Sequence, residues 1–531
     1  MTTYRNLDEC ATYKPLKTMR CGIPELSRER IAACSIPVAA GLTYNWSASP
    51  VDESLLSGLG ALAAEQELIA KFRLLAGGAV MNTGEKRLVL HHLARGELAG
   101  SVLRDGVDLR KFYEGERLKA ARFAEAIHAG MIRGSTGRQF ATAVQIGIGG
   151  SDLGPRACHI ALERWARKHG KLKMRAFFIS NVDPDDADST LQKLDLESTI
   201  FILVSKSGTT QETLANETLV RARLEAAGLD PRRHMVAVTS QTSPLAGNPE
   251  YLESFYIDDF IGGRYSTSSA VGGVILSLAF GPEIFAEFLE GAHEADLAAM
   301  EPDIGKNASM LDAMIGLYER NVLGMPCTAV LPYAEALSRF PAHLQQLDME
   351  SNGKSVNRAG EALGYATGPV VFGEPGTNGQ HSFYQLLHQG TDIVPLQFIG
   401  FAENQESSDV ESGGSTSRRK LLANLAAQIV AFARGRDSAD PNRRFAGGRP
   451  SVLIFGRELG PRQMGALLAH YENKVMFQGF AWNINSFDQE GVQLGKVLAG
   501  KVLSGSGDDP ALAAYAELVG LNEPSMRKAA R

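Results

Sequence analysis

Short apolar runs alternate with long helical patterns through most of this chain, and this alternation restricts the possible folds more than any other feature of the sequence. A helical pattern such as QETLANETLVRARLEAAG (211–228) lies between such runs. The runs occur at 142–150, 174–180, 198–205, 234–240, 327–334, 392–401 and 451–456. Continuous apolar strands that alternate with helices predict parallel sheets covered on both faces.

The runs fall into two blocks, 140–280 and 325–500, which predict two α/β domains. Before them, the stretch to about residue 110 has apolar residues at helical spacing. We therefore predict an α/β chain with two doubly wound parallel sheets covered by helices and a mainly helical N-terminal segment. The expected parts are a helical segment that packs on the large domain (1–110), a small domain (111–285), a large domain (286–510) and a C-terminal tail (511–531).

Charge and cysteine content narrow the classes of partner. The chain has 531 residues and a formal net charge of −6, so nothing favours nucleic acid or an anionic membrane as a general partner. No apolar stretch reaches the ~20 residues of a membrane span, and the N-terminus has no signal-peptide pattern. The odd number of scattered cysteines predicts neither a disulfide framework nor a zinc site, which favours a reducing compartment. We expect a cytoplasmic protein.

Three cofactor-binding patterns fail when their spacing is counted. GIGGSD has Asp152 where a dinucleotide-binding fingerprint needs its last glycine, and SNGKS has Asp348 where a P-loop needs its first. His381 and His388 stand seven residues apart, whereas metal-binding histidines on a helix stand four apart. We therefore expect no nucleotide cofactor, no nicotinamide cofactor and no metal.

A hydroxyl-rich turn, SKSGTTQET at 205–213, follows one of the apolar runs. Thr209 and Glu212 fit a capping box, which predicts that a helix begins there. The turn then lies at the carboxyl edge of a parallel sheet, where helix N-termini and hydroxyl groups bind anions. A capped turn without a ligand is the alternative, since serine and threonine commonly cap helices.

A second turn has a similar composition. VQIGIGGSDLGPR (144–156) leads from a strand through glycines to Ser151 and then toward a helix. Two such turns in one α/β block, each with glycine backbone and serine, are better explained by a phosphate group between them than by capping alone.

Four ionisable side chains are candidates for catalytic roles, although each of them taken alone is better explained as a surface, capping or packing residue. Arg264 follows two glycines and suits a developing oxyanion, yet most arginines are surface charges. Glu350 follows a helical segment, but most glutamates are solvated. A histidine at a helix start, such as His381, usually caps or packs, and a lysine such as Lys496 is usually solvated.

Taken together, the segments resemble the phosphoglucose isomerase family. The matching segments occur in the order of that family over roughly residues 80–500: GIGGSDLGP, SKSGTTQET, GGRYS, MESNGK, EPGTNGQHSFYQLLHQG and NSFDQEGVQLGK. The resemblance implies two sugar isomerase (SIS) domains and an enzyme of glycolysis and gluconeogenesis without a cofactor. Its reaction would interconvert D-glucose 6-phosphate and D-fructose 6-phosphate through ring opening and a cis-enediolate.

The resemblance also implies roles for individual residues. Glu350 is the implied base that moves a proton between C2 and C1, and Arg264 the charge that stabilises the enediolate. His381 and Lys496 are implied to open the sugar ring. The residues implied to bind the substrate are Gly150, Ser151, Ser205, Lys206, Ser207, Thr210, Gln346 and Gln489. Ser207 and Gly208 differ from the threonine and phenylalanine of many relatives, and Glu490 stands where an aromatic residue is common.

The resemblance further implies a homodimer whose active sites draw on both subunits, with His381 crossing over. Two alternatives stay open: an isomerase that also accepts mannose 6-phosphate, and a non-catalytic sugar-phosphate-binding module. Such a module would not need the implied base, arginine, histidine and lysine together. An aminosugar synthase requires an N-terminal cysteine, whereas Thr2 follows Met1 here.

Overall fold

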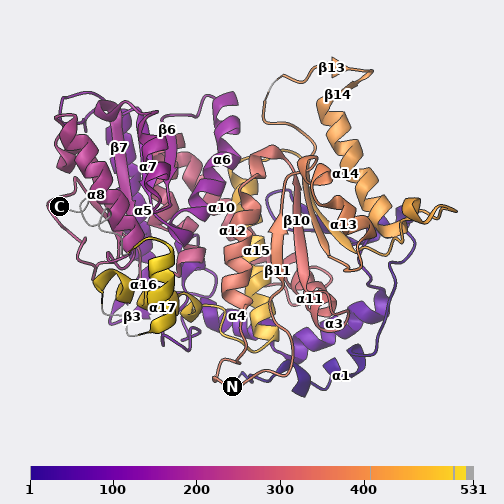
Figure 1. Ribbon diagram of the computed structural model, residues 1–531. Coiled ribbons are helices and arrows are strands. Elements are labelled where there is room, and N and C mark those ends of the chain that lie inside the picture. The colour runs from indigo at the N-terminus through magenta and orange to yellow at the C-terminus, as the bar shows by residue number, and fades with distance from the viewer. Residues whose placement is uncertain (1, 407, 506–508, 522–531) are drawn as a thin grey trace. The chain divides into compact units, whose positions relative to one another are not determined.

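The computed structural model describes residues 2–406, 408–505 and 509–521. The chain forms two compact units, Met1–Phe487 and Asp488–Arg531. The larger unit contains two mainly parallel sheets with helices on their faces (Figure 1). This arrangement confirms the predicted fold class, while the predicted division into four parts stays a prediction.

The first sheet has five parallel strands in the order β6-β5-β7-β8-β9. Successive side chains point to opposite faces of a strand. Val144 and Leu203 therefore share a core with α7 and α8, whereas Ala143 and Ile202 share a core with α5, α6 and α9. The bounds are Thr142–Ile146 (β5), Arg175–Ile179 (β6), Thr199–Val204 (β7), Met235–Thr239 (β8), Ser254–Tyr256 (β9), Leu109–His128 (α5), Leu153–Lys168 (α6), Pro184–Leu191 (α7), Gln211–Ala226 (α8) and Ala270–Phe280 (α9).

The second sheet has six strands in the order β1-β2-β15-β12-β10-β11. Strands β15, β12, β10 and β11 run parallel to one another. Helices α13 and α14 share a core with one face of the sheet. The bounds are Cys327–Tyr333 (β10), Val370–Gly373 (β11), Leu396–Phe401 (β12), Ser451–Gly456 (β15), Tyr384–Gln389 (α13) and Ser417–Arg434 (α14). All seven apolar runs of the sequence thus contain strands. Most of their side chains are buried between helical layers, whereas the edge strand β6 is only partly buried.

The N-terminal segment is mainly helical, as predicted, and it also supplies two short strands to the second sheet. β2 pairs antiparallel with β15, and β1 pairs antiparallel with β2. Three residues are too few to show an alternating pattern, so the sequence did not predict these strands. The bounds are Tyr13–Leu16 (α1), Arg28–Ala33 (α2), Ser35–Pro37 (β1), Thr43–Asn45 (β2), Glu53–Glu65 (α3) and Leu68–Ala76 (α4).

Helices lie between the two sheets of the larger unit, among them α6, α10 (Pro282–Ala298), α12 (Phe340–Gln345) and α15 (Pro461–Ala481) (Figure 1). The backbones of α10 and α15 approach closely, since a Cβ atom at Gly291 would collide with the Arg462 carbonyl. Next to this contact, Arg95 pairs with Asp296 of α10 and Glu472 of α15, and all three side chains are fully buried. The same region contains α11 (Ala308–Asn321).

Two two-stranded hairpins complete the larger unit, Leu103–Arg104 (β3) with Val107–Asp108 (β4) and Glu411–Ser412 (β13) with Ser415–Thr416 (β14). The second hairpin lies within 401–419, a polar stretch rich in glycine and serine. The smaller unit contains α16 (Gln493–Ser504) and α17 (Pro510–Leu518). Within the described residues, no helix has the length and apolar character needed to span a bilayer.

Candidate functional site

The two predicted phosphate-binding turns lie side by side at one edge of the first sheet. β5 pairs with β6 on one side and with β7 on the other, so the chain reverses its direction of travel across the sheet at β5. Ligands bind open α/β sheets at such a switch point, outside the carboxyl ends of the strands. The turn after β5 (147–151) and the turn after β7 (205–210) occupy that position.

The helix after β7 begins one residue later than the capping-box pattern predicts. Thr210, not Thr209, is the N-cap of α8, and its side chain makes no capping hydrogen bond. The Thr209 hydroxyl and N–H both donate to Ser207 Oγ instead, at 3.0 and 3.2 Å. The capping-box prediction was therefore wrong, because a local turn contact satisfies the threonine that was expected to cap the helix.

The remaining hydroxyl groups of this turn contact one another. The buried Ser205 hydroxyl donates to Thr210 Oγ1 at 3.1 Å and accepts the Gly208 N–H at 3.1 Å. Gly208 has φ of +67°, a left-handed conformation that favours glycine. The turn therefore gathers hydroxyl groups at the N-terminus of α8, where backbone N–H groups and the helix dipole attract anions.

Lys206 connects this turn to the loop that carries Arg264. Its Nζ donates to the carbonyl oxygens of Asp259 and Ile261 at 2.8 and 3.0 Å. Burial is the main cause that lowers the pKa of Lys206. The ammonium group thus ties two loops together and places positive charge beside the hydroxyl-rich turn.

The glycine turn after β5 is packed against the loop of Arg264 and against Gln346. A Cβ atom at Gly150 would collide with the backbone of Gly263 and would lie 2.7 Å from the Arg264 nitrogen. A Cβ atom at Gly149 would lie 3.2 Å from Gln346 Nε2. The absence of side chains at these glycines is what allows the three segments to meet.

Arg264 is buried and fixed by hydrogen bonds, so it is not the surface charge that a lone arginine suggests. Its Nε donates to Ser351 Oγ at 2.7 Å, and its Nη2 donates to the Ser486 carbonyl at 2.7 Å. Its Nη1 lies 3.7 Å from Glu350 Oε1, and the side chain is 1% exposed. The guanidinium therefore presents a fixed positive charge to the carboxylate of Glu350.

Glu350 ends a π-helix, Gln346–Glu350, that the sequence did not predict. Such single π-turns frequently mark functional sites. Glu350 Oε2 and Gln346 Oε1 are buried and have no hydrogen-bond partner among the described residues. Both oxygens are therefore able to accept a hydrogen bond from a polar ligand.

A buried polar cluster lies behind this π-helix. Asp348 and Lys474 line two adjoining cavities of ≈ 10 Å³ each, room for about one water molecule apiece. Lys474 Nζ lies 3.5 Å from Asp312 Oδ1. Burial raises the pKa of Asp348 to about 6 and that of Glu319 to about 8.

The three other candidate residues are placed differently. His381 ends a short 3-10 helix, Asn378–His381, and its side chain is exposed. Among the described residues, His381 forms no hydrogen bond or ion pair with Arg264 or Glu350. Gln489 and Lys496 belong to the smaller unit, where Lys496 is part of α16.

Sequence reasoning missed the residues that hold Arg264. These residues lie in motifs that the sequence analysis names: Ser351 in MESNGK, Tyr265 in GGRYS and Ser486 in NSFDQEGVQLGK. A motif does not reveal which residues contact one another in the folded chain. The His91 ring stacks on Tyr265 with the centroids 4.6 Å apart, a contact that no sequence pattern indicates. In the described part of the chain, no group of three or more His, Cys, Asp or Glu side chains could hold a metal ion.

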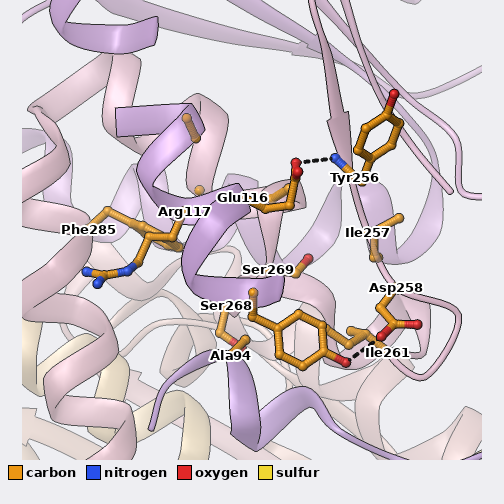
Figure 2. A pocket seen from close by; sticks show the side chains of 14 residues that line it. Ala94, Glu116, Arg117, Tyr256, Ile257, Asp258, Ile261, Ser268, Ser269 and Phe285 are labelled. Atoms are coloured by element: carbon orange, nitrogen blue, oxygen red, sulfur yellow. Dashed lines mark hydrogen bonds between the residues drawn. The ribbon is translucent and has the colours of Figure 1, made fainter. Parts of the chain in front are cut away.

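A cavity beside α5 is too small for the predicted substrate (Figure 2). Its volume is ≈ 20 Å³, whereas ligand pockets are usually several hundred Å³. Its polar groups are already paired: the Tyr113 hydroxyl donates to Asp258 at 2.8 Å, and the Tyr256 N–H donates to Glu116 at 2.7 Å. No residue of the candidate site lines it.

Known proteins match this chain over nearly its whole length. The family model "Phosphoglucose isomerase" matches residues 45–516. The glucose-6-phosphate isomerase of Treponema pallidum (strain Nichols) is 59% identical over 530 residues, 98% of this chain and 98% of that protein. The glucose-6-phosphate isomerase of Treponema denticola is 58% identical over 527 residues, 97% of this chain and 99% of that protein. The crystal structure of a glucose-6-phosphate isomerase from Chlamydia trachomatis has a TM-score of 0.91 and 44% identity, and the match covers 98% of this chain and 100% of that one.

Proposed function

The chain belongs to the phosphoglucose isomerase family, and we propose that it interconverts D-glucose 6-phosphate and D-fructose 6-phosphate. One observation carries the proposal: Glu350 has Oε1 3.7 Å from Nη1 of the buried Arg264, while its Oε2 is buried and has no hydrogen-bond partner among the described residues. A glycolytic isomerase needs these parts together. A binding module needs only the turns.

Glu350 is the base in this mechanism. Moving the carbonyl from C1 to C2 requires removal of the C2 proton, which is acidic because it is α to the C1 carbonyl. Glu350 accepts that proton and returns it to C1. In the same conversion O1 gains a proton and becomes a hydroxyl, and the O2 hydroxyl loses its proton and becomes the carbonyl oxygen. A carboxylate with one unpaired oxygen is suited to this transfer, because no hydrogen bond must be broken first.

Arg264 stabilises the negative charge that develops on the enediolate oxygens. Arginine keeps its proton at any working pH, so it does not compete for the proton that Glu350 carries. Its guanidinium is already held by Ser351 and Ser486, so little reorganisation is needed when the charge appears.

The two turns bind the phosphate, and this remote binding energy holds C1 and C2 in register with the base. Gly150 and Ser151 belong to the turn after β5. Ser205, Ser207 and Thr210 belong to the turn after β7, and Lys206 adds positive charge beside it. Gln346 and Gln489 complete the substrate contacts, Gln346 through its unpaired Oε1.

Ring opening is assigned to His381 and Lys496. A histidine both donates and accepts protons near neutral pH, as opening of a cyclic sugar requires. Because His381 is exposed and makes no contact with Glu350 within the described residues, we place it in the active site of a second subunit of a homodimer. The compartment we propose is the cytoplasm, since all five cysteines are free thiols, which are typical of reducing compartments.

The test is a coupled assay of the purified full chain with fructose 6-phosphate, mannose 6-phosphate and glucosamine 6-phosphate, with and without EDTA. We expect turnover of fructose 6-phosphate at roughly 1–10³ s⁻¹, the usual range for enzymes, and no effect of the chelator. Comparable kcat/KM with mannose 6-phosphate would replace the proposal by a broader hexose-6-phosphate isomerase. Binding of all three sugars without turnover would identify a non-catalytic module.

A further inference from the structure

Ser351 directly follows the proposed base, and its side chain is fully buried. It is 0% exposed and lies at the junction where the π-helix Gln346–Glu350 returns to α-helical geometry. A buried hydroxyl needs partners of its own, and the two that it has both come from the Arg264 loop.

The hydroxyl group of Ser351 joins two side chains that are adjacent in sequence. It accepts the Arg264 Nε–H at 2.7 Å and lies 2.9 Å from the Tyr265 hydroxyl. Arginine can only donate, whereas a serine hydroxyl has one hydrogen atom and two lone pairs. Ser351 can therefore serve both partners at once, which an apolar residue of the same size cannot do.

Tyr265 is itself held rigidly, so the contact fixes a position. Its ring stacks on His91 with an interplanar angle of 25°, and it is tilted against Phe487 with the centroids 5.8 Å apart. Its side chain is 1% exposed, and burial raises the pKa of its phenol, which therefore stays neutral. The Ser351 hydroxyl thus rests against an ordered neighbour.

These contacts determine where the charge of Arg264 points. Two hydrogen bonds at different atoms, Nε to Ser351 and Nη2 to the Ser486 carbonyl, fix both the position and the rotation of a planar guanidinium. Nη1 is then directed toward Glu350 Oε1 at 3.7 Å. Because Ser351 is the residue after Glu350, the anchor and the base move together.

We propose that Ser351 is a positioning residue for the isomerase reaction: its hydroxyl couples the Arg264 guanidinium to the turn that carries Glu350, so that base and charge keep one separation through the proton transfer. This inference rests on the proposed function. In this role Ser351 contacts neither the reacting carbons nor the phosphate and acts through Arg264.

The first test compares Ser351→Ala with Ser277→Ala, a matched change of a buried serine in α9 outside the site. For Ser351→Ala we expect kcat for fructose 6-phosphate to fall by about 10- to 100-fold, the size of effect that a small misplacement of catalytic groups produces. KM and the inhibition constant of inorganic phosphate should change by less than about twofold, because the phosphate-binding turns are intact. Ser277→Ala should retain the kcat of the unaltered chain.

The second test is a double-mutant cycle, which a merely structural role would not satisfy. If Ser351 acts through Arg264, adding Ser351→Ala to Arg264→Ala should leave kcat at the value of Arg264→Ala alone. Multiplicative losses would overturn the proposal. So would an unchanged kcat in Ser351→Ala, or a rise in KM that accounts for the whole loss of kcat/KM.

Tyr265→Phe provides an independent variant should Ser351→Ala fold poorly. It removes only the phenol hydroxyl, so kcat should fall by a few fold with KM unchanged, and full kcat would contradict the coupling. Different outcomes refute the proposed function and the positioning role. An unaltered chain without isomerase activity would refute the proposed function, whereas an active chain whose Ser351→Ala variant is equally active would refute only the positioning role.

Discussion

Glu350 and Arg264 form an ion pair that occupies only one of the two carboxylate oxygens. Their nearest atoms are 3.7 Å apart, and Glu350 Oε2 has no partner among the described residues. Leaving a buried acceptor unpaired costs about 1–3 kcal/mol, more for a charged group. This arrangement leaves one carboxylate oxygen able to accept a proton, as the role of base that we propose for Glu350 requires.

We predict that Glu350→Gln abolishes turnover without loss of binding. An amide has nearly the same shape but cannot accept the C2 proton, so kcat should fall by at least ~10². The inhibition constant of inorganic phosphate should stay within about twofold of its original value, because the phosphate-binding turns are unaltered. The measurement is a steady-state assay with phosphate as competitor. Glu225→Gln, on the exposed face of α8, is the matched control and should be fully active.

Near-normal isomerase activity of Glu350→Gln would show that Glu350 is not the base. A large loss of phosphate inhibition together with activity would instead point to misfolding of the site. Thermal unfolding of both glutamine variants separates these outcomes, since loss of the base alone leaves the unfolding temperature close to that of the unaltered chain.

A close approach of two backbone elements holds the turn after β5 against the segment that carries Arg264. The 3-10 turn Gly149–Ser151 packs against the 3-10 helix Gly263–Ser268, and Gly150 is where they touch. The Ser266 hydroxyl lies in the same contact, donating to the Gly263 carbonyl at 2.6 Å. The position of the arginine therefore depends on the absence of a side chain in the opposite turn.

We predict that Gly150→Ala impairs both stability and phosphate binding. The new methyl group would collide with the backbone of Gly263, which cannot move aside as a side-chain end could. The two turns should separate, raising KM for fructose 6-phosphate and lowering the free energy of unfolding. Gly115→Ala is the matched control, since nothing lies within 4 Å of its added Cβ on α5. Removing a helical glycine should stabilise the chain by roughly 0.5–1 kcal/mol. Equal behaviour of the two variants in urea unfolding and kinetics would contradict the close-contact argument.

At the scale of the whole molecule, we propose that His381 serves the active site of a second subunit. Its 3-10 helix belongs to the connection between β11 and β12 of the second sheet, whereas Arg264 belongs to the loop that follows the first sheet. The exposed imidazole is available to a neighbouring chain. The homodimer that we propose would use it to complete the partner's site.

Mixed dimers test this arrangement. Glu350→Gln and His381→Ala should each inactivate every site when present alone. A dimer with one chain of each kind has one site that contains both changes and one site that contains neither. Mixing the two inactive proteins under conditions that exchange subunits should therefore restore activity, up to about half of that of the unaltered protein in the mixed dimers. No recovery after exchange, verified by size-exclusion chromatography of differently tagged chains, would place His381 and Glu350 in the same subunit.

Much of this architecture could be predicted from local sequence. Each of the seven apolar runs contains a strand, because most of these runs are buried on both faces and their apolar composition is visible in the residues themselves. The short strands β1 and β2 were missed because pairing with β15, far away in the sequence, is what makes them strands. The helix start after β7 was misplaced by one residue because Thr209 bonds to Ser207 rather than capping α8.

Sequence alone is sufficient for the fold class, the family and the two hydroxyl-rich turns, since periodicity and ordered motifs are properties of neighbouring residues. It does not indicate that Arg264 is buried, that Glu350 ends a π-helix with an unpaired oxygen, or that Ser351 joins the two. Those features arise from contacts between segments about 90 to 220 residues apart, and local patterns carry no record of such contacts. Burial and hydrogen-bond partners come from three-dimensional packing, which brings an arginine and a glutamate from distant segments into the pair that we propose as catalytic.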